Sequence, residues 1–480
     1  MSSLLTDGDL ALGPGGARSP WLREALALET DSLPARALDG FGEADVAIVG
    51  GGYSGLWTAL QLSERAPDLR VVVLEQDICG GGPSGRNGGF VNGWWDELGT
   101  LVDLYGDEGA LSAAREVAAS VRAIGAWCDA NGVEAHYRRA GMLTVSTTPL
   151  HDGAWRRSVD TARRLGVGNE YVELSASEVA ERCRSPRFRG GALMRDAATL
   201  QPALLARGLR RVALQRGVTV HEQTRVNRVR HTARGFRLLT ENGELRARQV
   251  VLALNAWGAD WPGLRRSILA WSSYMVRTEP IPDRVAELGW TGGESIVDAR
   301  LSVHYFQVTA DGRIAFGAGG GRPGYGGRIG RSFTHDVRDA RRAAFGFRHL
   351  FPQLADVRLT DAWGGPIDVS PHHLPRFGSL QPGLHYAAGY SGNGVAPSHL
   401  AGRVLAALVL GSNEPLTRLP MVGPPSRRFP PEPLRYVGAR IMREAMIRRE
   451  DLEEQGRRAP WWLRQLTRIP RRLGYHLGLD

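Results

Sequence analysis

The clearest pattern of hydrophobic and polar positions lies between residues 45 and 75. Residues 46–49 form a short apolar run rich in β-branched side chains, which predicts a buried parallel strand. Apolar residues at helical spacing follow over residues 56–62, and Pro67 marks the end of that helix. A second apolar run at residues 71–74 ends at Glu75. The order strand, helix, strand predicts one βαβ unit.

Similar patterns along the rest of the chain predict a mixed α/β architecture. Helices are expected at 96–130, 151–165, 175–183, 202–216, 336–351 and 395–410. Strands are expected at 141–146, 218–221, 224–229, 236–240, 245–247, 250–254, 273–279, 302–308, 313–317 and 384–389. The dipeptide Asn242-Gly243 is a hairpin turn signal. The strand-rich segment 268–320 predicts a second sheet.

Length and composition narrow the class of protein. A chain of 480 residues with 42% hydrophobic residues predicts two globular domains. Its apolar runs are too short to span a membrane, and no signal peptide pattern opens the chain, so we expect a cytoplasmic protein. The three cysteines do not make a disulfide framework or a metal site. The adjacent His372 and His373 lack further ligands, so no metal is expected.

The net charge of +10 does not indicate a nucleic-acid partner. No Lys occurs, so all 60 basic residues are Arg. Residues 427–480 contain 13 Arg against 7 acidic residues, which accounts for +6 of that charge. A nucleic-acid footprint would need a basic face on a known module, and none is recognisable.

The predicted βαβ unit carries a dinucleotide fingerprint, Gly50-x-Gly52-x-x-Gly55. Gly50 permits the tight turn, Gly52 lets a pyrophosphate approach the backbone, and Gly55 allows close packing of helix and strand. The helix N-terminus attracts phosphate, and Glu75 can accept hydrogen bonds from a ribose. The same expression occurs at 80–85 and 319–324, but neither match has the strand, helix and acid, so both predict turns.

Two other glycine-rich segments are candidates for ligand binding. The loop at 79–90 contains six glycines with Arg86 and Asn87, which indicates backbone wrapped closely around a ligand. Residues 389–394 read GYSGNG and open a predicted helix, and such a helix terminus favours negative charge near it.

In combination, these segments resemble the FAD-dependent oxidoreductases of the glycine oxidase and D-amino acid oxidase family, and most of all the gamma-glutamylputrescine oxidase type. The resemblance covers residues 40–412. The segments that carry it are VGGGYSGLWTAL at 49–60, SGRNGGFV at 84–91, VVLALNAW at 250–257, DGRIAFGAGGGR at 311–322 and AAGYSGNGVAPSHLAGR at 387–403.

The resemblance implies an α/β fold in which a Rossmann-like FAD-binding domain with a parallel sheet is joined to an α+β substrate domain with an antiparallel sheet. The implied FAD-binding domain is discontinuous, comprising 40–95, 196–260 and 375–412. The substrate domain would comprise 96–195 and 261–374, and residues 413–480 would form a tail rich in Pro and Arg.

The same resemblance implies the site residues. Those expected to bind the cofactor are Gly50, Gly52, Ser54, Gly55, Glu75, Gln76, Ser84, Gly85, Arg86, Asn87, Gly88, Gly89, Val226, Ala253, Gly389, Ser391, Gly392, Asn393, Gly394 and Val395. Arg86, Asn87 and Tyr305 are the catalytic candidates. Tyr274, His304, Tyr305 and Trp363 lie on predicted strands or segments that should face the substrate.

The implied reaction removes hydride from a carbon next to an amine nitrogen, with hydrolysis of the imine and oxygen as the expected acceptor. Some relatives tether FAD through a Cys or a His, but no Cys lies beyond 183 and the 79–90 loop has no His, so FAD should be non-covalent. Some oxidases use a Lys to assist oxygen reduction. Because this chain has none, a dehydrogenase with another acceptor stays open.

Two further functions are compatible with parts of the sequence. An NADPH-using flavin monooxygenase would need a second helix-opening glycine motif, which the sequence lacks. A non-catalytic scaffold has only the Arg-rich tail in its favour. That tail is amphipathic and could lie on an anionic membrane surface, but we expect it to pack on protein and not to be needed for chemistry.

Overall fold

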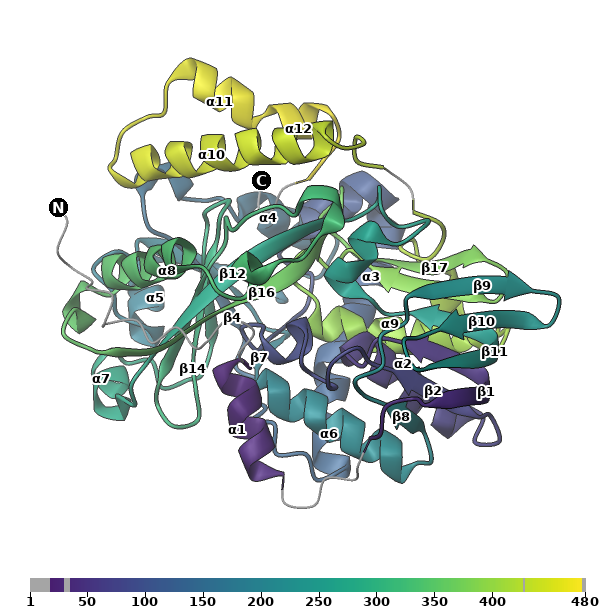
Figure 1. Ribbon diagram of the computed structural model, residues 1–480. Coiled ribbons are helices and arrows are strands. Elements are labelled where there is room, and N and C mark those ends of the chain that lie inside the picture. Colours follow the sequence, from purple (N-terminus) through teal and green to yellow (C-terminus); the bar gives the residue numbers. More distant parts are fainter. Residues whose placement is uncertain (1–17, 30–34, 426–427, 477–480) are drawn as a thin grey trace.

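The computed structural model describes residues 18–29, 35–425 and 428–476, so the end of the predicted tail, 477–480, lies outside it. Figure 1 shows two large sheets side by side, with helices packed on both. The first sheet contains the predicted βαβ unit, and the second contains the strands from the middle of the chain. The predicted α/β class is confirmed, with one mainly parallel and one mainly antiparallel sheet.

The first sheet has the strand order β17-β18-β11-β1-β2-β8. These strands are β1 (Gly40–Val49), β2 (Val71–Leu74), β8 (Thr219–His221), β11 (Gly243–Leu252), β17 (Arg376–Gln381) and β18 (Leu384–Ala388). β1 runs parallel to β2 and β11, with Val49 opposite both Leu74 and Leu252. The residues that follow these three strands therefore meet at one edge, where open α/β sheets bind ligands.

Four helices cover this sheet and its edge: α2 (Tyr53–Arg65), α3 (Leu98–Ala130), α6 (Pro202–Gln215) and α9 (Val395–Val409). α2 packs on α9 so closely that a Cβ at Gly402 would lie 2.5 Å from the Cβ of Trp57. α3 is 33 residues long and bends at Gly106, whose φ of 70° lies outside the helical region. A hairpin of β9 (Arg228–Thr232) and β10 (Gly235–Leu239) extends the sheet from β11.

The second sheet has the order β16-β12-β15-β14-β13-β4-β6-β5. Its strands are β4 (Met142–Ser146), β5 (Tyr171–Leu174), β6 (Gly190–Met194), β12 (Leu269–Thr278), β13 (Ser295–Asp298), β14 (His304–Val308), β15 (Ile314–Ala318) and β16 (Leu359–Val369). All neighbours are antiparallel except β13 and β4. α8 (Val337–Leu350) covers one face and buries an aromatic cluster that includes Phe306, Phe316 and Phe347.

Shorter elements complete the fold. They are α1 (Pro20–Leu28), β3 (Phe90–Asn92), α4 (Arg156–Arg164), α5 (Ala176–Arg182), β7 (Ala197–Thr199) and α7 (Pro282–Glu287). β3 and β7 pair in a two-stranded sheet. Both glycine matches outside the βαβ unit are loops, as predicted: Pro83–Gly85 is one short 3-10 turn, and 319–324 follows β15.

Several predicted strand boundaries differ from the structure, and two of them change the assignment. The segments 245–247 and 250–254 were predicted as separate strands, but β11 runs through them, because Arg248 points to solvent and Gln249, on the opposite face, donates its side-chain amide to the carbonyl of Val409 at 2.7 Å. Residues 224–227 are not a strand. Thr224 turns instead to donate its backbone N–H to the carbonyl of Glu75, at 2.7 Å.

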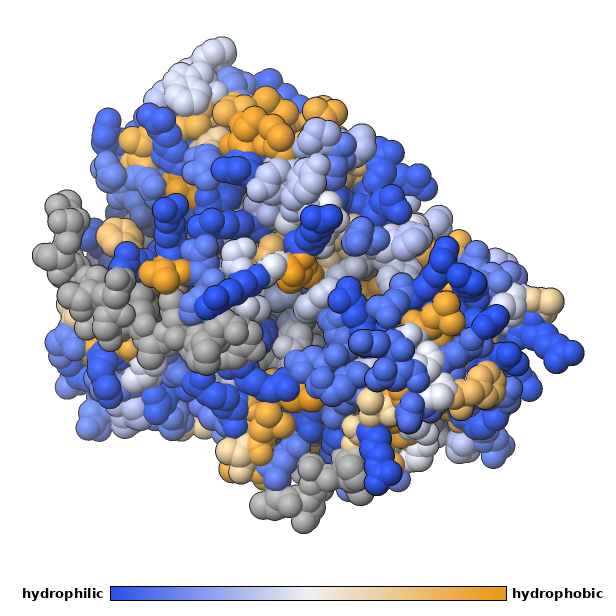
Figure 2. All heavy atoms as spheres, in the orientation of Figure 1, coloured by the Kyte–Doolittle hydropathy of each residue, from blue (hydrophilic) through white to orange (hydrophobic). Residues whose placement is uncertain are grey.

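The tail folds into α10 (Leu434–Glu454), α11 (Trp461–Thr467) and α12 (Ile469–Arg472), which lie across the top of the second sheet in Figure 1. It packs on protein, as predicted, and charged residues make much of the buried contact. Arg435, Glu450 and Glu453 are buried, whereas Leu434, Val437 and Ile441 are exposed. Figure 2 shows hydrophobic residues gathered over this part of the surface.

None of the described helices is long and apolar enough to cross a bilayer. Over the same residues, no group of His, Cys, Asp and Glu side chains is placed to hold a metal ion.

Candidate active site

A cavity of about 2190 Å³ is lined by residues of both sheets and of α10. The edge of the first sheet contributes Gly50, Glu75 and Ala253 to its wall, and the second sheet contributes Tyr305 and Met275. Pockets for one small ligand have volumes of about 300–1,000 Å³, so this cavity has room for an extended ligand and a second molecule.

The turn between β1 and α2 can exist only with glycines. Gly50 has a φ of 113°, and a Cβ there would collide with the carbonyl of Ala253. A Cβ at Gly55 would collide with the carbonyl of Gly50. The first residue of α2, Tyr53, donates its N–H to Ser84 Oγ at 2.9 Å, so the two glycine-rich loops touch at the helix N-terminus. The positive end of α2 therefore opens on the cavity.

Glu75 follows β2 and is only 9% exposed. Its carboxylate accepts the N–H of Gly51 at 2.7 Å and that of Asp77 at 2.9 Å. Burial raises the pKa of Glu75 to about 7, and these two backbone hydrogen bonds oppose that rise. The carboxylate is thus fixed beside the glycine turn, where it can accept further hydrogen bonds from a ligand in the cavity.

Asn87 and Arg86 shape the second glycine-rich loop. The Asn87 amide donates to the carbonyls of Pro83 and Ser84, both at 3.1 Å, and its Oδ1 accepts the N–H of Gly89 at 2.8 Å. Arg86 donates from Nε to the carbonyl of Gly81 at 3.1 Å. Both side chains line the cavity, yet much of their hydrogen bonding holds the loop itself in place.

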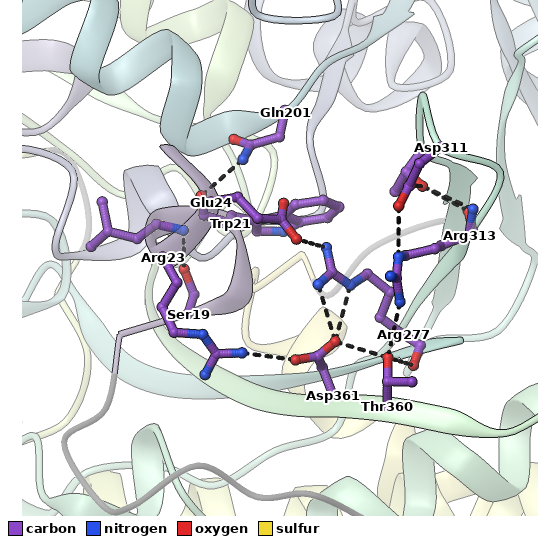
Figure 3. Close-up of polar contacts among 12 residues, drawn as sticks. Ser19, Trp21, Arg23, Glu24, Gln201, Arg277, Asp311, Arg313, Thr360 and Asp361 are labelled. Carbon is purple, nitrogen blue, oxygen red and sulfur yellow. Dashed lines mark hydrogen bonds and ion pairs between the residues drawn. The ribbon is translucent and has the colours of Figure 1, made fainter. Parts of the chain in front are cut away.

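Helix α1 connects this loop to the second sheet, and Figure 3 shows its polar contacts with Arg277 of β12 and Asp361 of β16. Trp21 donates its indole N–H to the carbonyl of Asn87 at 3.1 Å, and Gln201 donates to the carbonyl of Trp21. The buried Arg277 on β12 pairs with Glu24 at 2.6 Å and with Asp361 at 3.0 Å. The loop is therefore held between α1 and β16, since Trp363 also donates to the carbonyl of Arg86 at 2.9 Å.

Tyr305 stands over the end of the loop. Its ring is so close to Gly88 that a Cβ there would lie 3.0 Å from two ring carbons, and it meets Phe90 edge-on at 5.8 Å. Its hydroxyl shares a hydrogen bond of 2.8 Å with Ser273 Oγ. Burial raises the pKa of Tyr305 to about 12, so the phenol stays protonated at neutral pH.

The loop at 389–394 is organised by Asp368, a fully buried acid on β16. Its carboxylate accepts the backbone N–H groups of Gly389 and Tyr390 and the side-chain amide of Asn255. Burial raises the pKa of Asp368 to about 7 against these hydrogen bonds. Tyr390 in turn shares a 2.6 Å hydrogen bond with Ser54 on α2, so the N-termini of α2 and α9 are joined beside the cavity.

The structure brings most of the predicted cofactor residues to one wall. Those that line the cavity are Gly50, Gly52, Ser54, Glu75, Gln76, Ser84, Arg86, Asn87, Gly88, Val226, Ala253, Ser391, Gly392, Asn393, Gly394 and Val395. Gly55, Gly85, Gly89 and Gly389 lie behind it, where a Cβ would meet neighbouring atoms at short distance.

Of the predicted substrate residues, Tyr305 lines the cavity, and the structure places the other three elsewhere. His304, next to Tyr305, points to the opposite face of β14 and bonds Asp298 at 2.6 Å, because successive strand residues alternate in direction. Tyr274 is buried and donates to the carbonyl of Ser332, and Trp363 is buried against Trp21.

Sequence reasoning missed Asp368, Asn255 and Ser273. Asp368 had a signal, since it is an acid within an otherwise apolar strand segment, WGGPIDV. Asn255 has a positive φ of 46° at the end of β11, a conformation in which Asn is enriched. Ser273 carried no signal because its partner, Tyr305, is 32 residues away in sequence.

A dinucleotide flavin fits this cavity. The glycine turn leaves the approach to the α2 N-terminus without side chains, Glu75 offers a buried acceptor for a ribose, and the cavity continues past Gly88 to Tyr305. Cys79 does not line the cavity. It is buried behind Gly51, and burial raises the pKa of its thiol well above the ordinary value.

Fold and site define a flavin-dependent oxidoreductase, and the comparison with known families agrees. Residues 45–408 match the family described as "DAO: FAD dependent oxidoreductase". The chain belongs to this family. It is an enzyme whose cofactor is FAD.

The chain is also similar to individual named proteins. The chain is 29% identical to gamma-glutamylputrescine oxidoreductase of Escherichia coli strain K12 over 381 residues, which are 77% of this chain and 84% of that protein. It is 28% identical to glycine oxidase of Geobacillus kaustophilus over 388 residues, 76% and 92% of the two chains. The crystal structure of glycine oxidase from Geobacillus kaustophilus shares the fold with a TM-score of 0.64 at 22% identity, over 79% of this chain and 98% of that one.

Proposed function

We propose that this enzyme oxidises a C–N bond of a small amine or amino acid, with FAD held non-covalently in the cavity. The observation that carries the proposal is the single cavity that begins at the glycine turn and Glu75 and continues to Tyr305 above Gly88. Relatives named for the oxidation of gamma-glutamylputrescine and glycine support the substrate class.

The chain's own residues would divide the work of binding along the cavity. Gly50, Gly52 and the N-terminus of α2 would hold the pyrophosphate, Glu75 the ribose, and Val226 the adenine region. Gly88 and Asn87 would lie against the isoalloxazine. Residues 391–394 would meet its pyrimidine edge.

The domain division follows from the same assignment. We propose 40–95, 196–260 and 375–412 as the FAD-binding domain, and 96–195 and 261–374 as the substrate domain. The strands of the first sheet all fall within the former ranges and those of the second sheet within the latter. Residues 413–425 belong with the FAD-binding domain, since Met421 is buried there and accepts the N–H of Phe377 at 3.1 Å.

FAD, when bound, supplies the hydride acceptor for the oxidation. The chain would orient the substrate carbon and keep water from it. Tyr305 would form a wall over the reacting carbon, and its protonated hydroxyl, held by Ser273, would act as a hydrogen-bonding group and not as a base. The N-terminus of α9, fixed by Asp368, would favour negative charge at the end of the cavity that it faces.

Anaerobic reduction tests this function. We expect the flavin absorbance near 450 nm to bleach with one or more compounds from a panel of simple amines, N-methyl amino acids, amino acids and aminophosphonates. NADPH should leave it unchanged, because among the described residues only one glycine motif opens a helix between two parallel strands. Bleaching by NADPH and by none of the panel would contradict the proposal in favour of a monooxygenase.

We propose oxygen as the electron acceptor of the reduced flavin. The sequence gives a reason to test another electron acceptor as well. The chain has no Lys to assist oxygen reduction, and an Arg stays protonated and cannot replace a Lys as proton donor. Stoichiometric peroxide in air would support the oxidase. Turnover only with an artificial dye would support a dehydrogenase.

A further inference from the structure

Residues 92–97, at the end of β3 and before α3, form part of the cavity wall. They have no role in the FAD binding or the amine oxidation proposed above. Asn92, Asp96 and Glu97 line the cavity there, together with Met142 from the start of β4. The segment directly follows the loop that carries Gly88, so this wall continues from the region beneath Tyr305.

Two buried acceptor atoms in this wall have no partner among the described residues. Asn92 is 8% exposed, and its Oδ1 accepts no hydrogen bond, while its Nδ2 contacts Met142 Sδ at 3.0 Å. Asp96 Oδ1 is buried and equally without a donor. A buried acceptor left unsatisfied costs about 1–3 kcal/mol, so two in one cavity wall indicate donors supplied by a ligand.

No described cation neutralises Asp96. Burial raises the pKa of Asp96 to about 7, and only the backbone N–H groups of residues 96 and 97 oppose that rise. The nearby Asp196 differs, because Arg122 and Arg139 pair with it at 2.7 and 3.2 Å. Arg300 also lines the cavity, but it pairs with Glu450 and Glu454 of α10.

The wall therefore offers two acceptors, and Asp96 supplies its negative charge. The group that matches it has several N–H donors and a positive charge, as an ammonium does. A guanidinium also has these properties, but it needs a planar fork of acceptors, and one amide oxygen and one carboxylate oxygen suit the smaller group.

Position along the chain separates this wall from the reacting nitrogen. The ring of Phe90 meets that of Tyr305, and Asn92 follows two residues later on the same strand, β3, which places it roughly 7 Å farther along the strand. A substrate that has one nitrogen near Tyr305 and reaches Asn92 and Asp96 needs a second nitrogen several methylene groups away.

We propose that Asn92 and Asp96 form a subsite for a distal ammonium group, so that the preferred substrates are aliphatic amines with a second ammonium at the far end. This proposal rests on the amine oxidation proposed above. Such a subsite would favour diamines and longer polyamines over amines with a single charged nitrogen.

The test compares two probes that differ by one ammonium group, 1,4-diaminobutane and butylamine, with longer diamines as a length series. We expect kcat/KM of the holoenzyme to favour a diamine over its monoamine by about 10- to 100-fold, the range of a charge-assisted hydrogen bond. Asp96→Asn and Asn92→Leu should each reduce that ratio at least fivefold. Glu108→Gln makes the same charge change at an exposed position of α3 and should keep the wild-type ratio.

Calorimetric titration of each diamine into the purified protein gives a readout independent of turnover. Diamine binding that is lost in Asp96→Asn, without oxidation of any panel amine, would overturn the proposed amine oxidation and support the subsite. Oxidation of diamine and monoamine at equal kcat/KM, or a ratio unchanged in folded Asp96→Asn and Asn92→Leu, would overturn the subsite and leave the amine oxidation standing.

Discussion

At the scale of single residues, the glycines of the β1–α2 turn differ in the atoms that a side chain at each position would meet. Gly50 and Gly55 are confined by backbone carbonyls of the protein itself. Gly52 is confined only by Ser84 Oγ, 2.8 Å from the position of a Cβ, and that hydroxyl can rotate away. A side chain at Gly52 is therefore tolerated by the fold better than by a ligand in the cavity.

This difference predicts the effect of Gly52→Val. We expect the variant to fold in part and to lose FAD, because the branched side chain occupies the approach of the pyrophosphate. The measurement is the flavin-to-protein absorbance ratio of the purified variant. Gly190→Val is the matched control, since Gly190 lies on β6 outside the cavity with its nearest neighbour 3.5 Å from a Cβ. Full flavin content in Gly52→Val would refute the assignment of this turn.

Tyr305 leads to a prediction about pH. Burial raises the pKa of its hydroxyl to about 12, so the group is protonated in the folded enzyme at every pH below that value. Tyr305→Phe should lower kcat by roughly 10-fold through the lost hydrogen bond, with the shape of the pH–rate profile unchanged between pH 6 and 10. Loss of one limb of the profile in Tyr305→Phe would show that Tyr305 titrates during turnover, which contradicts the assignment.

At the scale of elements, α10 is attached to the second sheet by charged groups. Glu450 is 1% exposed and accepts the N–H of Ser302 at 2.6 Å as well as pairing with Arg300. Truncating one partner of a buried ion pair leaves the other charge buried, which is costly even where the intact pair adds little.

Glu450→Ala should therefore lower the free energy of unfolding by about 3 kcal/mol. Chemical denaturation of the holoenzyme measures this difference. Glu444→Ala, on the exposed side of the same helix, should change it by less than about 0.5 kcal/mol. Equal effects of the two substitutions would mean that α10 is not held by the buried pair.

Removal of the whole C-terminal segment separates cofactor binding from substrate binding. A cut after Gly411 would remove Met421 from the core, whereas a chain ending at Pro425 keeps it. We expect that shortened chain to retain FAD, because no predicted cofactor residue lies beyond 395. Met442 and Arg443 of α10 line the cavity, so KM for the amine should rise while the flavin-to-protein ratio stays at the wild-type value. Loss of flavin would place the tail in the cofactor site.

At the scale of the whole molecule, the proposed FAD site lies between the two sheets, and no Cys of the described residues lines it. The loop at 79–90 has no His, and of the three cysteines only Cys79 is near, buried behind Gly51 and outside the cavity wall. Acid precipitation should therefore release all FAD into the supernatant. Yellow colour retained on the washed pellet would contradict non-covalent binding.

The sequence by itself determined the parts of this protein that rest on local rules. Backbone geometry requires glycine at Gly50 and Gly55, and parallel pairing in a βαβ unit brings Gly50 and Glu75 to one edge of the sheet. For that reason the α/β class, the residues of the cavity wall at this edge and the family could be predicted from residues 45–75 and the later glycine segments.

Only the tertiary structure decided what depends on strand direction and on contacts distant in sequence. A shift of one residue reverses the face to which a strand side chain points, so Tyr305 and not His304 reaches the cavity. Asp368 acquires its partners from residues 389 and 390 only when β16 lies beside that loop. The amphipathic pattern of α10 did not determine how the helix packs, because Arg300, in the loop between β13 and β14, pairs with Glu450 and Glu454 of the helix. Periodicity records which side chains share a face, but the charge and shape of the neighbouring surface decide which face is buried.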